Sequence, residues 1–300
     1  MTIGHSPETS DHLAEFLERH SLRRSSVIEA EIKAIHWASV ANILVNHGYA
    51  RLAEEMFSRE PAIGILLNLL HRSFEHLDAS IVAFTTGSGS SSEGLSRVTV
   101  ELSVSILYIL AGHREARLLA FFQNYVEGED KRMGLWSKAV QHLSEPERAE
   151  HASAIKHRRS GIAAINQFLT KLRTEVAQST PGILNESWPS TVAARFDKIG
   201  DSAGYRTIYS RMSSQIHSDA EETIRYFMGR TLGDEKVLGR MSMETIWFSK
   251  FMVYIAVSYF LRANSAYAKC YAMTEELLLL EAGQHIINAE LSLIAKYVDG

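Results

Sequence analysis

The sequence has a single cysteine, Cys270, in 300 residues. One cysteine excludes an internal disulfide and any zinc site built from several cysteines, and it suits a reducing compartment. The start of the chain, residues 1–11, is polar and lacks the apolar stretch of a secretory signal. We therefore expect the protein to be cytoplasmic.

Long hydrophobic runs and a strong excess of one charge are also missing. The longest apolar run, residues 251–261, falls short of the roughly 18 to 20 residues that span a bilayer, so we expect a buried core helix and no membrane. The formal net charge is −4, from 31 basic and 35 acidic residues. Such a chain lacks the general cationic surface that gives non-specific affinity for nucleic acid. Any contact with RNA would have to be local.

Helix-breaking residues are few, with five prolines and 18 glycines, and apolar residues recur three and four positions apart. This spacing favours helices over strands. Pro61 suits a first helical turn, and Ser144 with Glu147 forms a capping-box pair at another helix start. The sequence predicts an all-α fold, a multi-helix bundle of about seven to nine helices. The expected helices cover residues 25–46, 61–84, 95–111, 115–126, 144–176, 205–227, 242–263 and 267–298.

Residues 85–94 (TTGSGSSSEG) are rich in glycine and serine, which is typical of a domain linker or of a mobile loop within one bundle. We favour the loop. The expected organisation is an N-terminal helical region over residues 1–85, the loop over residues 86–94, and a helical bundle over residues 95–300. The bundle and the N-terminal helices are expected to pack as one compact unit, with a looser region at residues 183–204.

The motifs of several common enzyme classes are absent. The sequence has no Glu-x-x-His pair of a di-iron bundle and no His-Glu-x-x-His zinc motif. It has no Gly-x-Ser-x-Gly nucleophile elbow and no glycine motif for a dinucleotide or a nucleoside triphosphate. We therefore expect no cofactor and no metal.

Residues 205–217 (YRTIYSRMSSQIH) are the segment most suggestive of chemistry. On a continuous helix, one side would be a core face of tyrosines and apolar residues, and the neighbouring side would carry polar groups. That polar side consists of Arg206, Ser210, Ser213 and His217. Such a set suits phosphate chemistry, because arginine offers a permanently charged fork and histidine exchanges a proton near neutral pH. The alternative is that His217 caps or pairs locally and the serines face water.

Arg211 and His217 are separated by five residues, which fits the Arg-x4-6-His motif of HEPN ribonucleases, helical domains common in bacterial toxin and antiviral systems. Residues 95–227 resemble, more specifically, a HEPN-like bacterial family of unknown function. Its pattern is Tyr-x3-Tyr-x3-Ser-x3-His after a tryptophan-proline segment, with an earlier helix that carries Arg-x3-Glu and a later arginine. The matching residues are Tyr205, Tyr209, Ser213 and His217 with Trp188 and Pro189, and Arg97, Glu101, Tyr108 and Arg117.

The resemblance implies a HEPN-like core within residues 95–300, extended by N- and C-terminal helices. It also implies a homodimer with a metal-independent RNA-cleaving site shared across the interface. His217 would be the catalytic acid and base, and Arg211 or Arg206 would hold the phosphate. Six residues put Arg211 about 120° around a continuous helix from His217, whereas Arg206 shares its side, so the choice between them stays open. The supporting residues would be Ser213, Tyr209, Glu101 and Arg97.

Structural roles are also open for several of these residues. Arg97 and Glu101 are four residues apart and are expected to form a salt bridge on one helix. If Glu101 instead lay beside His217, it would orient the imidazole and raise its pKa. Tyr205 and Tyr209 also suit a core. The basic run at residues 156–159 (KHRR), flanked by Arg148 and Arg173, is typical of a solvated helix face, with a nucleic-acid edge as the alternative.

Two functional hypotheses follow. The first is a metal-independent endoribonuclease or toxin effector of a bacterial defence or stress system, acting on RNA and associated with a partner protein of that system. The second is a catalytically inactive helical dimer that binds RNA, a nucleotide or a partner protein. Met212 favours the second hypothesis, because active HEPN nucleases usually carry a polar residue directly after the motif arginine.

Overall fold

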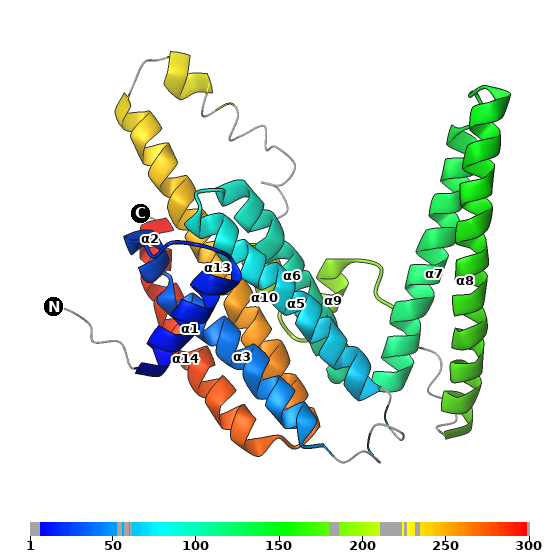
Figure 1. Ribbon diagram of the computed structural model, residues 1–300, viewed down its shortest axis with the longest axis horizontal. Coiled ribbons are helices and arrows are strands. Elements are labelled where there is room, and N and C mark those ends of the chain that lie inside the picture. Colours follow the sequence, from blue (N-terminus) through cyan, green and yellow to red (C-terminus); the bar gives the residue numbers. More distant parts are fainter. Residues whose placement is uncertain are drawn as a thin grey trace. The chain divides into compact units, whose positions relative to one another are not determined.

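The computed structural model describes residues 7–52, 56, 60, 62–179, 186–210, 224, 227–231 and 235–298. Within these ranges the regular structure is entirely helical (Figure 1), and the predicted all-α helical bundle is confirmed. The helices are α1 (Pro7–Arg19), α2 (Ser26–Glu29), α3 (Ile32–Ala50), α5 (Ala62–Thr85), α6 (Gly89–Leu110), α7 (Arg114–Ala139), α8 (Glu145–Ser179), α9 (Val192–Lys198), α10 (Ser202–Gly204), the π-helix η1 (Tyr205–Tyr209), α13 (Glu235–Cys270) and α14 (Thr274–Val298). These twelve elements in the described part exceed the expected number, since α1 and the short helices were not predicted.

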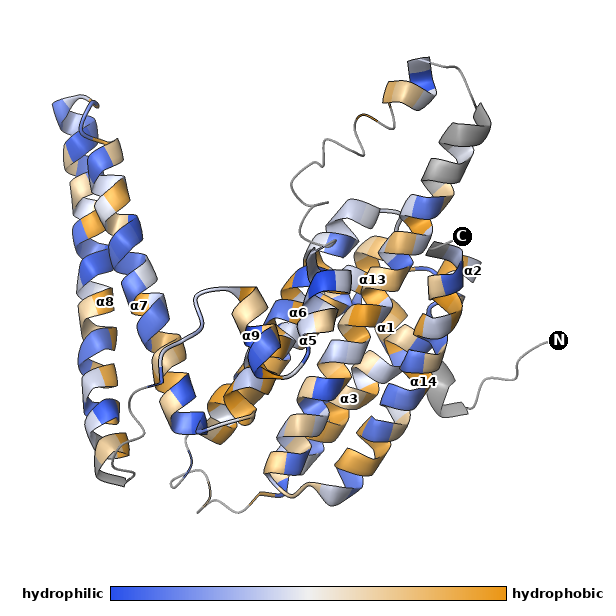
Figure 2. Ribbon diagram, turned by 180° about the vertical axis from the view of Figure 1, so that it is seen from behind, coloured by the Kyte–Doolittle hydropathy of each residue, from blue (hydrophilic) through white to orange (hydrophobic). Residues whose placement is uncertain are grey.

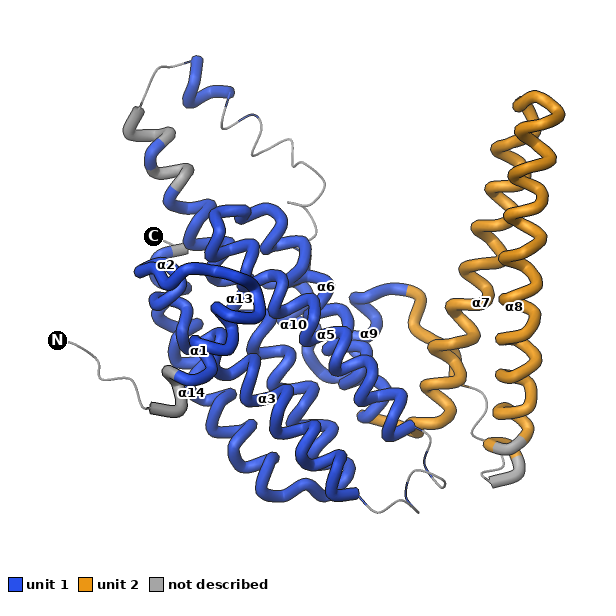
Figure 3. Tube along the Cα trace, in the orientation of Figure 1, with its two compact units in different colours: residues 1–110, 191–300 blue, residues 111–190 orange. Residues whose placement is uncertain are grey.

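The chain divides into two compact units (Figure 3), which we call unit 1 (residues 1–110 and 191–300) and unit 2 (residues 111–190). This differs from the expectation that residues 95–300 form a single bundle. The physical reason is that α7 and α8 bury their apolar seams against each other, so this helix pair has a core of its own.

Helix α13 is the centre of unit 1. It packs against α3, α5, α6 and α14, and Figure 2 shows apolar residues gathered along it. Met252, Tyr254 and Phe260 are among its fully buried side chains. The stretch Met243–Cys270 is long and apolar enough to cross a membrane by length and composition, but 72% of its most apolar window is buried inside the protein. That burial is the pattern of a core helix.

A seam of small hydroxyl side chains joins α5 and α6. Ser80 Oγ lies 2.7 Å from Ser96 Oγ and donates to the backbone oxygen of Ser92 at 3.0 Å. About two helical turns away along the same seam, Ser73 Oγ lies 3.3 Å from Ser103 Oγ. Small side chains allow two helix backbones to approach closely. The expected loop over residues 86–94 is shorter than predicted, because α6 begins at Gly89, and Ser92 near its start is buried and hydrogen-bonded to Ser80 of α5.

Unit 2 is a helical hairpin of α7 and α8. Its core residues recur every seven positions, as in a two-stranded coiled coil. At the start of α8, one half of the predicted capping box is present: Glu147 Oε2 accepts a hydrogen bond from Ser144 N (3.0 Å), while Ser144 Oγ donates to the same oxygen (2.6 Å). The buried core consists of Leu119, Val126, Met133, Ile155, Ile162 and Leu169.

Candidate functional site

The segment expected to be loose, residues 183–204, contains two ordered helices before the candidate motif. Thr191 caps α9 by accepting a hydrogen bond from Ala194 N at 3.1 Å. Asp201 caps α10 in the same way, accepting from Gly204 N at 3.2 Å. Side-chain capping of this kind satisfies backbone groups that a helix end leaves free. The two short helices therefore fix where η1 begins.

Helix η1 is π-helical rather than α-helical, and Ser210 N donates to the backbone oxygen of Tyr205. The predicted helix at residues 205–227 thus starts with a different hydrogen-bond pattern. A π-turn shifts side chains around the helix axis, so α-helical spacing does not decide whether Arg206 and His217 share a side. Single π-turns are rare in proteins, and many of those that occur lie at functional sites.

Tyr209, at the end of η1, joins two residues of α6. Arg97 Nε donates to Glu101 Oε1 at 2.9 Å and to Tyr209 Oη at 3.1 Å, and Tyr209 Oη donates to the same carboxylate oxygen. The Arg97 guanidinium also lies 5.3 Å from the centre of the Tyr209 ring. The predicted Arg97–Glu101 salt bridge is confirmed, and the structure brings three of the four predicted supporting residues into one network.

Burial and hydrogen bonding set the charge state of this network. Burial, followed by the hydrogen bond to Glu101, raises the pKa of the Tyr209 phenol above its ordinary value near 10, so the phenol stays neutral. Burial alone would lower the pKa of the Arg97 guanidinium, but the bonds to Tyr209 and Glu101 raise it above its ordinary value. The network is therefore an ion pair of Arg97 and Glu101 in which the neutral hydroxyl of Tyr209 bonds to both side chains.

A second network, of an aspartate, a tyrosine and an arginine, joins the N-cap of α10 to α13. Asp201 Oδ2 accepts hydrogen bonds from Tyr259 Oη at 2.8 Å and from Arg262 Nη1 at 2.6 Å. Burial and the bond to Asp201 raise the pKa of the Tyr259 phenol above its ordinary value. Gly204 makes this closeness possible, because a Cβ there would lie 2.4 Å from Tyr259 Oη and 2.6 Å from Asp201 Oδ1.

Phe196 connects the two networks. Its side chain is fully buried, and its ring centre lies 5.7 Å from that of Tyr209 and 5.7 Å from that of Tyr259. The ring of Tyr205 lies 5.8 Å from that of Phe196 and stacks on that of Tyr209 at 5.5 Å. The sequence-based expectation of a tyrosine core face therefore agrees with the structure for residues 205 and 209.

Two further arginines lie beside this aromatic cluster. Arg206 is exposed, and its guanidinium carbon lies 5.7 Å from the centre of the Tyr205 ring. Arg195 is half-buried, and burial lowers the pKa of its guanidinium despite the favourable charge of Glu101. Sequence reasoning missed Arg195, Asp201 and Arg262, because each becomes relevant only through contacts between elements.

The remaining predicted residues do not all fall in the described part. Arg211, Ser213 and His217 lie outside the described residues, so the geometry around His217 stays a prediction. Tyr108 is buried in unit 1. Arg117 lies in unit 2, where its Nε donates to Glu186 Oε2 at 2.6 Å.

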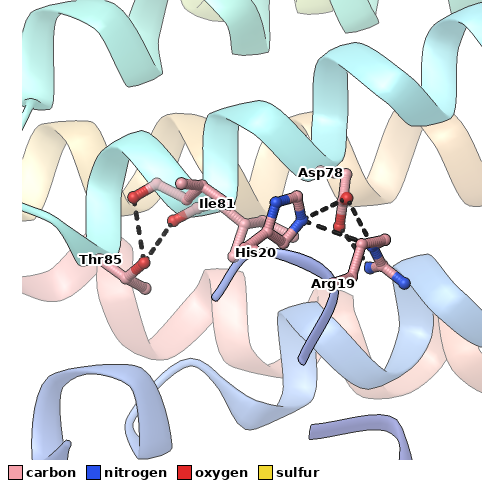
Figure 4. Close-up of polar contacts among 6 residues, drawn as sticks. Arg19, His20, Asp78, Ile81 and Thr85 are labelled. Atoms are coloured by element: carbon pink, nitrogen blue, oxygen red, sulfur yellow. Dashed lines mark hydrogen bonds and ion pairs between the residues drawn. The ribbon is translucent and has the colours of Figure 1, made fainter. Parts of the chain in front are cut away.

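A histidine of unit 1 that the sequence did not single out lies in an ion-pair cluster (Figure 4). His20 Nε2 lies 2.7 Å from Asp78 Oδ2, and Arg19 Nη2 donates to Asp78 Oδ1 at 2.8 Å. The cluster ties the C-terminal end of α1 to α5, which is a structural role. Among the residues that the structure describes, no group of three or more His, Cys, Asp or Glu side chains is arranged to hold a metal ion.

A family model described as a family of unknown function, DUF5677, matches residues 64–236, which is more than half of the chain. The match runs from within α5 to the first residues of α13 and includes the Arg97–Glu101–Tyr209 network. No curated protein and no solved structure matches the chain.

Proposed function

The chain belongs to DUF5677, a family of unknown function, and from this premise we propose that it is a HEPN-like, metal-independent endoribonuclease. The single observation that carries the proposal is the network of Arg97, Glu101 and Tyr209. This network anchors η1, the element that directly precedes Arg211 and His217 in the sequence. Three of the four supporting residues that the resemblance implies are therefore in contact just before Arg211 in the sequence.

The proposed chemistry needs only groups of this chain. His217 accepts the proton of a ribose 2′-hydroxyl, whose oxygen then attacks the neighbouring phosphorus, and the protonated His217 gives that proton to the departing 5′-oxygen. Arg211 or Arg206 balances the extra negative charge on the phosphate in the transition state. The products are a 2′,3′-cyclic phosphate and a free 5′-hydroxyl. Tyr209, Glu101 and Arg97 act as positioning residues, and Ser213 supports His217.

A homodimer is part of the proposal, and α14 offers a surface for a second copy. Five large apolar side chains follow one side of this helix and are 41% to 64% exposed: Leu278, Leu279, Ile286, Leu293 and Tyr297. Two small exposed residues, Ala282 and Ala289, lie on the same side. Because large and small residues alternate on this side of α14, it can interlock with the same side of a second copy. Exposed apolar faces of this kind mark interaction sites.

We place the protein in the cytoplasm, where a single half-buried cysteine meets no oxidising conditions. Its biological role in this proposal is that of a toxin effector in a bacterial defence or stress system, with RNA as its target and a partner protein of the same system as its regulator. The support for this role is the resemblance of residues 95–227 to HEPN-like proteins.

The test is RNA cleavage in the presence of a metal chelator. The purified full chain is expected to degrade total RNA, and His217→Ala is expected to abolish the activity. His285→Ala is the matched control, because His285 is an exposed histidine of α14. Loss of activity in both variants, or activity that disappears on chelation, would contradict the proposal. An intact fold without any cleavage would support the catalytically inactive dimer instead.

A further inference from the structure

Unit 2 has a cavity of about 580 Å³ between α7 and α8, near the end where the hairpin turns. Three cations line it, Arg148, Lys156 and Arg159, together with the apolar side chains of Val140 and Ile155. Small-molecule sites in proteins commonly have volumes of about 300 to 1,000 Å³. The cavity is therefore large enough for a small ligand that has both an anionic and an apolar part.

Two of the three cations of the cavity have no ion-pair partner among the residues that the structure describes. Lys156 and Arg159 form no ion pair with any residue that the structure describes, and Arg148 has only a long contact of 3.5 Å to the exposed Glu145. Their neighbour Arg158 differs, because its Nε donates to Glu129 Oε2 at 2.6 Å. The basic run of α8 is thus divided between one structural arginine and a cationic cavity wall.

Unit 2 also differs in charge from the rest of the chain. Residues 111–190 contain eleven basic and nine acidic residues, whereas the chain as a whole has a net charge of −4. The other segments therefore carry the acidic excess. The net charge of unit 2 therefore favours an anionic ligand, whereas the net charge of the remaining segments does not.

We propose that the cavity between α7 and α8 binds the phosphate of a nucleotide, either free or within a single-stranded RNA. The guanidinium groups of Arg148 and Arg159 offer paired donors that match phosphate oxygens, and Lys156 adds a compact charge. Val140 and Ile155 provide an apolar surface for the base. The inference concerns unit 2 alone and holds whether or not residues 205–217 carry out cleavage.

The experiment measures binding of two probes to the full-length protein in a His217→Ala background, which protects the RNA. The probes are ADP and a fluorescently labelled short single-stranded RNA. The site variant is Lys156→Gln/Arg159→Gln. The control is Lys131→Gln/Lys138→Gln, which removes the same charge from exposed positions of α7 outside the cavity.

We expect the site variant to weaken binding at least tenfold and the control less than twofold, as the loss of two phosphate contacts implies. Loss of two contacts should also reduce the salt dependence of RNA binding by about 1.4 units of the logarithmic slope, at about 0.7 per contact for a single strand. Binding of ADP alone would assign the cavity to a free nucleotide. Equal weakening in both variants, absence of binding by both probes, or equally tight binding of a glutamate-rich peptide would each overturn the proposal.

Discussion

Two tyrosines on either side of Phe196 are held by matching sets of partners. Tyr209 lies between a carboxylate and an arginine of α6, and Tyr259 lies between Asp201 and Arg262. In each set the carboxylate accepts bonds from both other members. Buried hydroxyls with satisfied partners of this kind fix local structure firmly. The junction of α9, α10 and η1 is therefore expected to be among the most rigid parts of unit 1.

The buried tyrosines predict a loss of stability at alkaline pH. Burial raises the pKa of each of four phenols above its ordinary value near 10, namely Tyr209, Tyr254, Tyr259 and Tyr267. Because the neutral phenol is the favoured form in the folded state, their contribution to stability is complete below about pH 10 and declines above it. Tyrosinate absorbance should show part of the 11 tyrosines titrating only on unfolding. Titration of all 11 near pH 10 in folded protein would contradict this.

Gly204 predicts a sharp steric effect. An added Cβ would lie 2.4 Å from Tyr259 Oη, so Gly204→Ala must displace the Asp201 network and should cost about 1 to 3 kcal/mol of unfolding free energy. Gly64→Ala is the matched control in the same unit, since its Cβ would meet only Tyr49 Oη at 3.9 Å. Its effect should be neutral or stabilising by up to about 1 kcal/mol, because alanine forms helices better than glycine. Chemical denaturation of both variants measures the difference, and equal stabilities would disprove the steric account.

At this scale the sequence predicted the contacts that depend on local spacing and missed the others. Arg97 and Glu101 are four residues apart on one helix, so their ion pair follows from helix geometry. Asp201 and Arg262 are 61 positions apart, and no local rule brings them together. Tyr209 was selected by a resemblance, and only the structure shows that its hydroxyl reaches α6.

Among the elements, the α7–α8 hairpin contains a polar layer in an apolar seam. Glu129 is 2% exposed, and Arg158 and Arg132 both donate to its carboxylate. Glu129 and Arg158 lie three residues after the core residues Val126 and Ile155, at the second position of a heptad where an apolar residue would be expected. A charged pair in such a seam selects one register of the two helices rather than adding to their stability.

Replacing Glu129 and Arg158 together should stabilise the hairpin. Glu129→Leu/Arg158→Leu completes the apolar seam and is expected to raise the unfolding temperature, whereas Glu129→Ala alone leaves Arg158 without its partner and should lower it. The hydrogen bond from Arg158 lowers the pKa of Glu129, so its contribution is present above the ordinary glutamate pKa and is lost in acid. Circular dichroism melts at neutral and acidic pH measure both effects. A double variant less stable than the single one would refute this interpretation.

Helix prediction was successful where apolar spacing continued and failed where packing decided. The starts of α5 and α8 follow from Pro61 and the Ser144–Glu147 box. The glycine and serine residues before Leu95 resemble a loop in isolation, but residues 89–94 are helical, and Ser92 among them is buried against Ser80 of α5. The π-turn of η1 has no signal in the sequence, because it depends on how Tyr205 and Tyr209 pack around Phe196.

For the whole molecule, composition predicted the fold class but not the division into two units. A helical bundle follows from the scarcity of prolines and the apolar spacing of the chain. The separate core of unit 2 does not follow from these features. The apolar seams of α7 and α8 show that each helix packs against another helix, but not which one. The heptad spacing of residues 119, 126 and 133 with residues 155, 162 and 169 is the signal that could have paired them.

The exposed face of α14 predicts self-association. Ile286→Glu places a charge at the middle of that face and should shift the protein from dimer to monomer, because an unpaired charge is costly to bury in an apolar interface. Asn288→Asp is the control, since it adds the same charge at an exposed position about 160° around α14 from Ile286. Sedimentation velocity over a range of concentrations measures the change. A monomeric native protein would remove the support for an α14 dimer.

The central claim is that the network anchoring η1 serves RNA cleavage, and the most direct test compares the two buried tyrosines. Tyr209→Phe and Tyr259→Phe each remove one hydroxyl from an arginine–carboxylate set beside Phe196, and each should cost about 1 kcal/mol of stability. The single-turnover rate constant for RNA cleavage, measured with a chelator on folded protein, should fall at least tenfold in Tyr209→Phe and less than about twofold in Tyr259→Phe. Equal rate constants for the two variants, or the opposite order, would contradict the claim.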